Sequence, residues 1–277
     1  MNKKLAFIGT GNMGGALIKA VCRRIDPQQV LITNRNRKKA EGLAAETGCR
    51  VLQSNEEAAR EGDYLFLCVK PQGMGDLLKE ISPVLNQRME KNPPNALISI
   101  AAGLTIEGLR DLLEGECRKL PWMRVMPNTP VAVGKGMLAL AADETIPETM
   151  LEDMEYSFSG AGRMERIPEG QMDSFAVVGG CTPAFAYIFL EALADGGVRV
   201  GLSRQQALTY AAQAVLGAAS MVLETGKHPG SLKDAVCSPN GSTIAGVAAL
   251  EKAGFRSAAM EAVREGYLRN VELGKKE

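Results

Sequence analysis

Three glycines near the start of the chain have the spacing of a dinucleotide-binding turn. Residues 7–14 read FIGTGNMG, which places the pattern G-x-G-x-x-G at Gly9, Gly11 and Gly14. An apolar segment precedes the pattern, and a segment with helical spacing follows it. In such a turn the first glycine permits the tight bend, the second lets the backbone approach a pyrophosphate, and the third lets helix and strand pack closely. The N–H groups at the start of the helix then attract the phosphates, so the motif predicts a dinucleotide site.

The residues after the second apolar segment distinguish between the two nicotinamide cofactors. Residues 33–39 read TNRNRKK and contain no acid, whereas an NAD site usually has Asp or Glu here to bind the ribose 2′-hydroxyl. The basic and amide side chains present instead could bind a 2′-phosphate: Arg35, Arg37, Lys38, Asn34 and Asn36. We therefore predict NADPH as the cofactor and keep NADH as the alternative. A solvated helix start is the other interpretation of these charges.

Two further apolar segments, FLCVKPQ (66–72) and SIAAG (99–103), end in small or unusual residues. Ligands of open α/β sheets bind outside the carboxyl ends of the strands, so these ends should line the rest of the cofactor. Pro71 restricts Lys70 to an extended conformation. The small residues of the second segment leave room for a nicotinamide ring. For Lys70, a position on the surface at the end of a strand is the alternative.

Strands and helices alternate along the first 142 residues of the chain. Apolar segments predict strands at 4–9, 29–34, 50–54, 64–71, 95–103, 122–128 and 136–142. Amphipathic segments between them predict helices at 11–24, 37–48, 55–62 and 105–113, the last with Thr105 as its N-cap. Apolar strands that alternate with amphipathic helices indicate a parallel sheet covered on both faces.

The pattern changes after Pro147, where we find helical segments and little strand character. Ser203 and Gln206 have the spacing of a capping box. Residues 207–223 are apolar on nearly all faces, as in a helix buried against another subunit. We therefore predict an α/β Rossmann domain at residues 1–162, followed by an all-α C-terminal dimerisation domain at residues 163–277.

Composition excludes several classes of protein. The 277 residues contain 32 basic and 32 acidic side chains without a charged tail, so we expect no nucleic-acid partner. No stretch approaches the ~20 unbroken apolar residues of a membrane span, and the N-terminus lacks the pattern of a signal peptide. The six cysteines form no C-x-x-C pair, so we expect no metal. A reducing cytoplasm is the expected location.

Hydrolytic chemistry is not supported by the remaining candidates. His228 is the one histidine and precedes Pro229 in a predicted loop, which is a poor setting for a general acid or base. No G-x-S-x-G pattern surrounds it or Ser238, so a Ser-His-Asp hydrolase is disfavoured. The segment MPNTP (126–130) is either a rigid structural loop or part of a site.

Several motifs in order along the chain resemble the Δ1-pyrroline-5-carboxylate reductase family. They are FIGTGNMG, SNEEA (54–58), LFLCVKPQ, SIAAGLT (99–105), RVMPNTPVAVGKG (124–136), ALADGGVRVGLSRQQA (192–207), HPGSLKDAV (228–236) and SPNGSTIAGVAALE (238–251). The last is close to the family signature S-P-G-G-T-T-I-A-G. Together the motifs cover most of the chain.

The resemblance implies a Rossmann domain followed by a helical domain, and a homodimer in which the helical domains of two subunits build each active site, often assembled further into decamers. It implies reduction of pyrroline-5-carboxylate to L-proline with NADPH. Cofactor contacts carried over by position are Ile8, Gly9, Thr10, Gly11, Asn12, Met13, Asn34, Arg35, Asn36, Asn55, Val69, Lys70, Pro71, Ala101 and Ala102. Substrate contacts map to Glu169, Ser238, Ser242 and Thr243.

The expected reaction is hydride transfer to a cyclic imine that carries a carboxylate. A Gly-Ser-Thr turn that enters a helix can bind the carboxylate through N–H groups and the helix dipole. The Thr243 hydroxyl is the candidate catalytic group near the imine nitrogen, where it would orient the substrate or relay a proton rather than act as a strong acid.

Three departures from the family pattern affect the expected substrate range or cofactor affinity. The family commonly has S-G-S-G-P-A where this chain has GGCTPA (179–184), Gly where it has Asn240, and Asn where it has Ala235. Two alternatives therefore stay open. One is a reductase of a related cyclic imine or a 2-keto acid, and the other is a nucleotide-sensing protein without catalysis.

Overall fold

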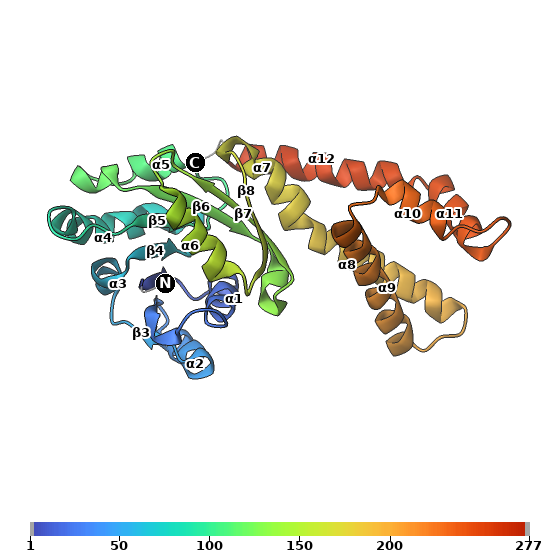
Figure 1. Ribbon diagram of the computed structural model, residues 1–277, viewed down its shortest axis with the longest axis horizontal. Helices are drawn as coiled ribbons and strands as arrows, with labels where there is room; N and C mark the ends of the chain where they lie inside the picture. The colour runs from blue at the N-terminus through green and yellow to red at the C-terminus, as the bar shows by residue number, and fades with distance from the viewer. Residues whose placement is uncertain (1–2, 275–277) are drawn as a thin grey trace. The chain divides into compact units, whose positions relative to one another are not determined.

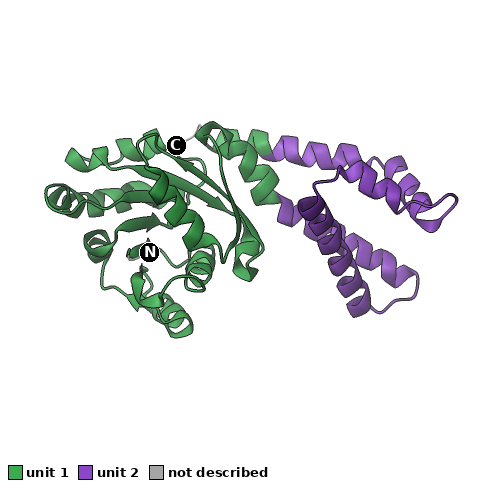
Figure 2. Cartoon of the chain, viewed as in Figure 1, with its two compact units in different colours: residues 1–181, 267–277 green, residues 182–266 purple. Residues whose placement is uncertain are grey.

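The computed structural model describes residues 3–274. The chain forms two compact units, which Figure 2 shows in different colours. Unit 1 takes in the chain up to Cys181 and again from Tyr267 onward, and unit 2 is Thr182–Gly266. Compactness thus places the division after residue 181, while the functional boundary at residue 162 stays a prediction.

Unit 1 is built on one sheet (Figure 1). Its strands are β1 (Leu5–Ile8), β2 (Val30–Thr33), β3 (Arg50–Val51), β4 (Tyr64–Leu67), β5 (Ala96–Ser99), β6 (Trp122–Pro127), β7 (Gly136–Ala142) and β8 (Gly162–Arg166). They lie in the order β3-β2-β1-β4-β5-β6-β7-β8. The first six positions have the strand order of a dinucleotide-binding fold, 3-2-1-4-5-6.

Helices cover both faces of this sheet. They are α1 (Asn12–Val21), α2 (Arg37–Thr47), α3 (Asn55–Glu61), α4 (Met74–Met89), α5 (Ile106–Asp111), α6 (Glu148–Phe158) and the short α7 (Met172–Phe175). One face buries Phe7 and Phe66, whose rings stack with centroids 4.3 Å apart. The opposite face buries Leu65 and Trp122. Burial on both faces explains the continuous apolar runs of the strands, and the predicted Thr105 cap is confirmed by its bond to the Gly108 N–H.

Two features of the sheet differ from the sequence prediction. Strand β7 runs antiparallel to β6, because residues 128–135 reverse the chain through a 3₁₀ helix, Thr129–Val133, before β7 begins. The Asn128 Oδ1 accepts from the Met137 N–H at 3.0 Å and ties the two ends of this connection. Strand β8 follows residue 147, where we expected little strand character. Its sequence GRMER has no apolar run because it is the edge strand, and Arg166 there pairs with Glu148 on α6.

Unit 2 is helical. It contains α8 (Thr182–Arg199), α9 (Arg204–Thr225), α10 (Pro229–Ala235) and α11 (Ser242–Lys252), and α12 (Phe255–Gly274) runs from it into unit 1. The predicted capping box at Ser203 and Gln206 is confirmed. Together these elements give the predicted fold class, an α/β Rossmann part followed by helices.

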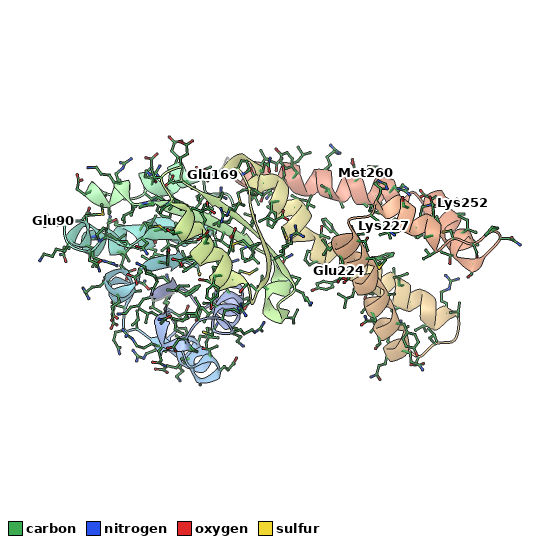
Figure 3. The ribbon with its side chains drawn as sticks, in the orientation of Figure 1. Glu90, Glu169, Glu224, Lys227, Lys252 and Met260 are labelled. Carbon is green, nitrogen blue, oxygen red and sulfur yellow. The ribbon has the colours of Figure 1, made fainter. Side chains whose placement is uncertain are left out.

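Large apolar side chains of unit 2 are exposed in the isolated chain. Ile188, Leu223 and Met260 each keep 68% of their surface exposed, and Met260 is labelled in Figure 3. The segments Glu169–Arg199 and Arg204–Thr225 are long and apolar enough to cross a membrane by length and composition alone. Large exposed apolar surfaces of this kind are typical of a site that contacts another protein or a membrane.

Candidate cofactor and substrate sites

The carboxyl ends of the central strands lie at one edge of the sheet. Ile8 is in register with Thr33 on one side and with Leu67 on the other, and Leu67 is in register with Ser99. The predicted cofactor segments follow these aligned ends: residues 8–13, 34–36, 69–71 and 101–102. The topology therefore brings the segments that follow β1, β2, β4 and β5 to the same edge of the sheet.

The glycines of the first turn have the steric roles predicted from the motif. Gly9 has a φ of +106°, and a Cβ there would lie 2.6 Å from the Cys68 carbonyl oxygen. A Cβ on Gly14 would lie 2.4 Å from the Gly9 carbonyl oxygen. A Cβ on Gly11 would meet nothing within 4 Å. The first helix thus begins against open space, and no side chain caps its first N–H groups. This arrangement fits a pyrophosphate.

A cavity of about 390 Å³ lies beside the ends of β2 and β3. Its lining includes Arg35 and Asn55. The Asn34 Oδ1 accepts from the Thr10 N–H at 3.1 Å, which holds the β2 end against the glycine turn. Arg37 is already paired with Glu41 at 2.8 Å. Arg35 has no ion pair with any residue of the described chain, so it is the cation available to a 2′-phosphate.

Glu80, to which we assigned no role from the sequence, also lines this cavity. From α4 it accepts hydrogen bonds from the Asn55 Nδ2, the nearer oxygen at 3.0 Å, while the Asn55 Oδ1 accepts from the Thr33 hydroxyl at 3.3 Å. Both ends of the Asn55 amide are therefore held. No sequence signal marks Glu80, because it is one of two acids, with Asp76, on an amphipathic helix.

The strand ends at which we predict the nicotinamide, those of β4 and β5, carry small and extended residues. Lys70 has φ −67° and ψ 151°, the extended conformation expected before Pro71. The Ser99 Oγ accepts from the Ala101 N–H at 3.2 Å and fixes the turn after β5. Ala101 is buried and Ala102 is exposed.

Glu169 lies close to this end of the edge. It begins the short turn between β8 and α7, and Figure 3 labels it there. Its Oε1 accepts from the Ile106 N–H at 2.7 Å, at the start of α5, and from the Arg124 Nη1 at 3.0 Å. Arg124 is on β6 in register with Ser99, and only 5% of its side chain is exposed. A buried guanidinium thus holds the predicted substrate-binding carboxylate.

Asn128, a buried residue directly after β6, holds the segment that follows Glu169 and α7. The Asn128 Nδ2 donates to the Gly179 carbonyl at 2.8 Å. Gly179 belongs to a π-helical turn, Ala176–Cys181, that leads into α8. Turns of this kind are often found at functional sites. The segment MPNTP thus has a structural role, which was one of the two interpretations left open by its sequence. Arg124 could have been found from the sequence, because it is a charged residue inside an apolar strand.

In unit 2, Ser238, Ser242 and Thr243 lie where a tight turn enters α11. The Gly241 N–H donates to the Ser238 carbonyl at 3.1 Å. Asn240 has a φ of +55° and is the one non-glycine residue of the described chain with positive φ. A type II turn requires a positive φ at its third position and commonly has Pro at its second, and Asn is among the non-glycine residues that best tolerate a positive φ. Asn240 therefore has a backbone conformation that Gly, the residue the family commonly has here, adopts without steric cost.

The start of α11 is open to a ligand. Gly241 is its N-cap and supplies no side-chain hydrogen bond to the first N–H groups. Thr243 is exposed, and within residues 3–274 its hydroxyl has no hydrogen bond. His228, by contrast, is the N-cap of α10, with its Nδ1 accepting from the Gly230 N–H at 3.1 Å. The histidine ring thus has a structural role as a helix cap. It lies at the start of a helix, whereas we predicted a loop.

Comparisons with known proteins match two parts of the chain to two families. Residues 4–103 match the family described as NADP oxidoreductase coenzyme F420-dependent. Residues 169–273 match the family described as pyrroline-5-carboxylate reductase dimerisation. The pyrroline-5-carboxylate reductase of Escherichia coli (strain K12) is 39% identical over 277 residues, 99% of this chain and 100% of the relative. The chain belongs to the pyrroline-5-carboxylate reductase family.

Other members are equally long. The reductase of Methanosarcina acetivorans is 40% identical and covers 99% of both chains. The crystal structure of the Plasmodium falciparum pyrroline carboxylate reductase with NADP bound has a TM-score of 0.83 and 32% identity, over 99% of this chain and 98% of that one. The resemblance, the fold class and the oxidoreductase class predicted from the sequence are confirmed.

Proposed function

We propose that this pyrroline-5-carboxylate reductase family member reduces Δ1-pyrroline-5-carboxylate to L-proline with NADPH, the last step of proline biosynthesis. The observation that carries the proposal is the full-length relationship, 39% identity over 99% of the chain, to a reductase of this name. The site geometry agrees with it at both ends of the reaction, cofactor and substrate.

The residues at the sheet edge fit NADPH. Gly11 leaves open space before the uncapped start of α1, where the pyrophosphate would bind. Arg35 lines the cavity where a 2′-phosphate would bind. The nicotinamide supplies the hydride when bound. The chain must hold the nicotinamide ring against the ring of the cyclic imine in one orientation. We assign this positioning to Ala101 and Lys70, which follow the neighbouring strands β5 and β4.

The substrate needs partners for a carboxylate and for a ring nitrogen. The free N–H groups and the dipole of α11 suit the carboxylate, with Ser238 and Ser242 as further donors. The Thr243 hydroxyl, which has no partner among the described residues, can donate to the nitrogen as it becomes an amine. Glu169, fixed by Arg124, is the acidic group we assign to the substrate site.

The family match to a dimerisation domain indicates a homo-oligomer. We propose a homodimer whose helical units cover each other's exposed apolar side chains, with decamers as the larger assembly. The helices α8 and α9 are long and apolar enough to cross a membrane by length and composition. In the proposed dimer their exposed apolar faces are subunit contacts instead. We assign the protein to the cytoplasm.

Changing Arg35 to Ala should narrow the preference for NADPH over NADH. Arg35 is the unpaired cation of the cavity, so its loss should raise the KM for NADPH roughly tenfold, the value of one charge-assisted hydrogen bond, and leave the KM for NADH nearly unchanged. Steady-state rates with each cofactor measure this. Arg37→Ala is the matched control, because Arg37 is already paired with Glu41. Equal KM values for the two cofactors in the unmodified protein would contradict the assignment.

The substrate assignment is tested by following NADPH oxidation with three kinds of acceptor. Pyrroline-5-carboxylate should be reduced with the highest kcat/KM, its six-membered homologue more slowly, and simple 2-keto acids not measurably. A higher kcat/KM for the six-membered imine would move the assignment to a related cyclic-imine reductase. Cofactor binding without turnover of any imine would support the sensing alternative.

A further inference from the structure

The cavity beside the ends of β2 and β3 contains a carboxylate as well as a cation. Glu80, on α4, lines this cavity together with Arg35, which follows β2. Within residues 3–274, neither side chain forms an ion pair, with the other or with a third residue. Glu80 is exposed, so both charges can interact with a ligand that enters the cavity.

A series of hydrogen bonds connects Glu80 to the glycine turn. The Asn55 Nδ2 lies 3.2 and 3.0 Å from the two carboxylate oxygens of Glu80 and donates to them. The Asn55 Oδ1 accepts from the hydroxyl of Thr33, a buried residue at the end of β2, at 3.3 Å. The Thr33 carbonyl in turn accepts from the Gly9 N–H at 2.8 Å. The Glu80 carboxylate is therefore held in a defined position relative to the predicted cofactor segments.

The Glu80 carboxylate can accept more hydrogen bonds than it receives from Asn55. An ionised carboxylate only accepts hydrogen bonds, so the nitrogen of the Asn55 amide, rather than its oxygen, must face Glu80. The two carboxylate oxygens together have about four acceptor sites, of which one amide nitrogen can occupy at most two. Glu80 can therefore accept a further hydrogen bond from a hydroxyl group of a ligand in the cavity.

We propose that Glu80 is a specificity-determining residue, which accepts a hydrogen bond from the ribose 2′-hydroxyl of NADH and repels the 2′-phosphate of NADPH. An NAD site usually has an acid at the end of the second strand for this hydroxyl. Residues 33–39 contain none, and Glu80 brings a carboxylate to the same cavity from α4. This role of Glu80 rests on the proposed function, which places the ribose of the cofactor in this cavity.

The two charges of the cavity act differently on the two cofactors. The 2′-phosphate of NADPH is negatively charged, so Arg35 attracts it and Glu80 repels it. The 2′-hydroxyl of NADH is neutral, so it gains a hydrogen bond from Glu80 and little from Arg35. The preference for NADPH is therefore smaller than Arg35 alone would give, and NADH remains a usable cofactor.

Binding of NADP⁺ and NAD⁺ to the full-length Glu80→Gln variant tests the proposal without any imine substrate. The Gln side chain has nearly the same shape, and its amide oxygen can still accept from the Asn55 Nδ2, so the substitution removes mainly the charge. Isothermal titration calorimetry measures the Kd of each cofactor. We expect the Kd for NADP⁺ to fall and the Kd for NAD⁺ to rise, so that their ratio changes roughly tenfold in favour of NADP⁺. An unchanged ratio would overturn the proposal.

Glu90→Gln is the matched control for the loss of one negative charge. Glu90 is the C-cap of the same helix and is labelled in Figure 3. It lies roughly 15 Å from Glu80 along the helix axis, beyond the screening length of about 8 Å at physiological ionic strength. Its replacement should leave the ratio of the two Kd values unchanged. An equal shift in this control would show that the net charge of the protein, rather than Glu80, sets the preference.

A third variant separates the charge of Glu80 from its support of Asn55. Glu80→Ala removes both, so it should shift the ratio in the same direction as Glu80→Gln and weaken NAD⁺ binding further. If Glu80→Gln instead weakens both cofactors equally, Glu80 acts only by holding Asn55, and its role in specificity is wrong. Failure of the unmodified protein to bind either cofactor would be a different result, because it would contradict the proposed function itself.

Discussion

Replacing Thr243 by Val should lower kcat for pyrroline-5-carboxylate by roughly a hundredfold, the contribution typical of a group that positions or relays a proton. The hydroxyl has no partner among the described residues, so its removal costs the fold little. Val keeps the branched shape at the second position of α11. The KM for NADPH should therefore stay within about twofold, because that cofactor meets the edge of the sheet rather than this side chain.

Thr209→Val is the matched control for this substitution. Thr209 is an exposed helical threonine of unit 2 whose hydroxyl bonds to the Gln205 carbonyl within its own helix at 2.9 Å. Its replacement should leave kcat unchanged. If Thr243→Val also retains kcat, the nitrogen partner is another group, and the proton role assigned to Thr243 must be moved.

Replacing Arg124 by Met should raise the KM for pyrroline-5-carboxylate roughly tenfold or more, with a smaller change in the KM for NADPH. Arg124 is 5% exposed and holds Glu169, which would keep only the Ile106 N–H as a fixed partner. The carboxylate would then rotate into solvent. Arg124→Lys keeps the charge and should recover part of the lost kcat/KM, which a purely structural role would not require.

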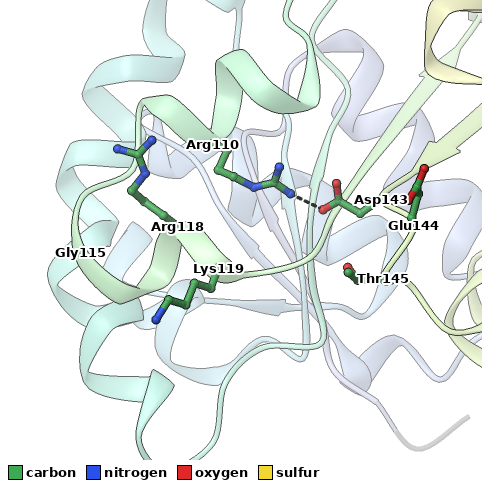
Figure 4. Close-up of a pocket in the computed structure, with 7 residues that line it drawn as sticks. All are labelled: Arg110, Gly115, Arg118, Lys119, Asp143, Glu144 and Thr145. Carbon is green, nitrogen blue, oxygen red and sulfur yellow. Dashed lines mark hydrogen bonds and ion pairs between the residues drawn. The ribbon is translucent and has the colours of Figure 1, made fainter.

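The ion pair between Arg110 on α5 and Asp143, which follows β7, provides a control near the start of β6. It lies at the amino end of β6, where the Asp143 Oδ2 also accepts from the Trp122 N–H at 2.7 Å, beside a cavity of about 690 Å³ (Figure 4). Arg110→Met should lower the unfolding temperature without changing the KM for substrate. Equal effects of both substitutions on KM would show that Arg124 acts only through stability.

The glycine turn and the sheet around it could be predicted because the forces that shape them act locally. Gly9 and Gly14 are required by contacts within one strand–turn–helix unit, and the apolar strands reveal a sheet covered on both faces. The strand ends then meet at one edge by topology alone. Arg35 could be named as a candidate because it is the second residue after the end of β2.

The parts that escaped prediction depend on contacts between distant segments. Arg124 and Glu169 are 45 residues apart and meet only after β6 and the turn before α7 are placed. Strand β8 is an edge strand with charged residues, so it lacks the apolar pattern that reveals a strand. Asn240 looked like a departure from the family signature, yet it has a positive φ, a conformation that Gly adopts readily and Asn tolerates. The backbone conformation explains the presence of Asn at this position, and the residue type alone did not reveal that conformation.

Transfer of a labelled hydride to the substrate tests the central claim most directly. The full-length protein is incubated with pyrroline-5-carboxylate and NADPH deuterated at the nicotinamide C4, and the product is separated on a chiral column and examined by NMR. The account predicts L-proline with deuterium at C5, the former imine carbon. Proline without deuterium, or oxidised cofactor without proline, would contradict it.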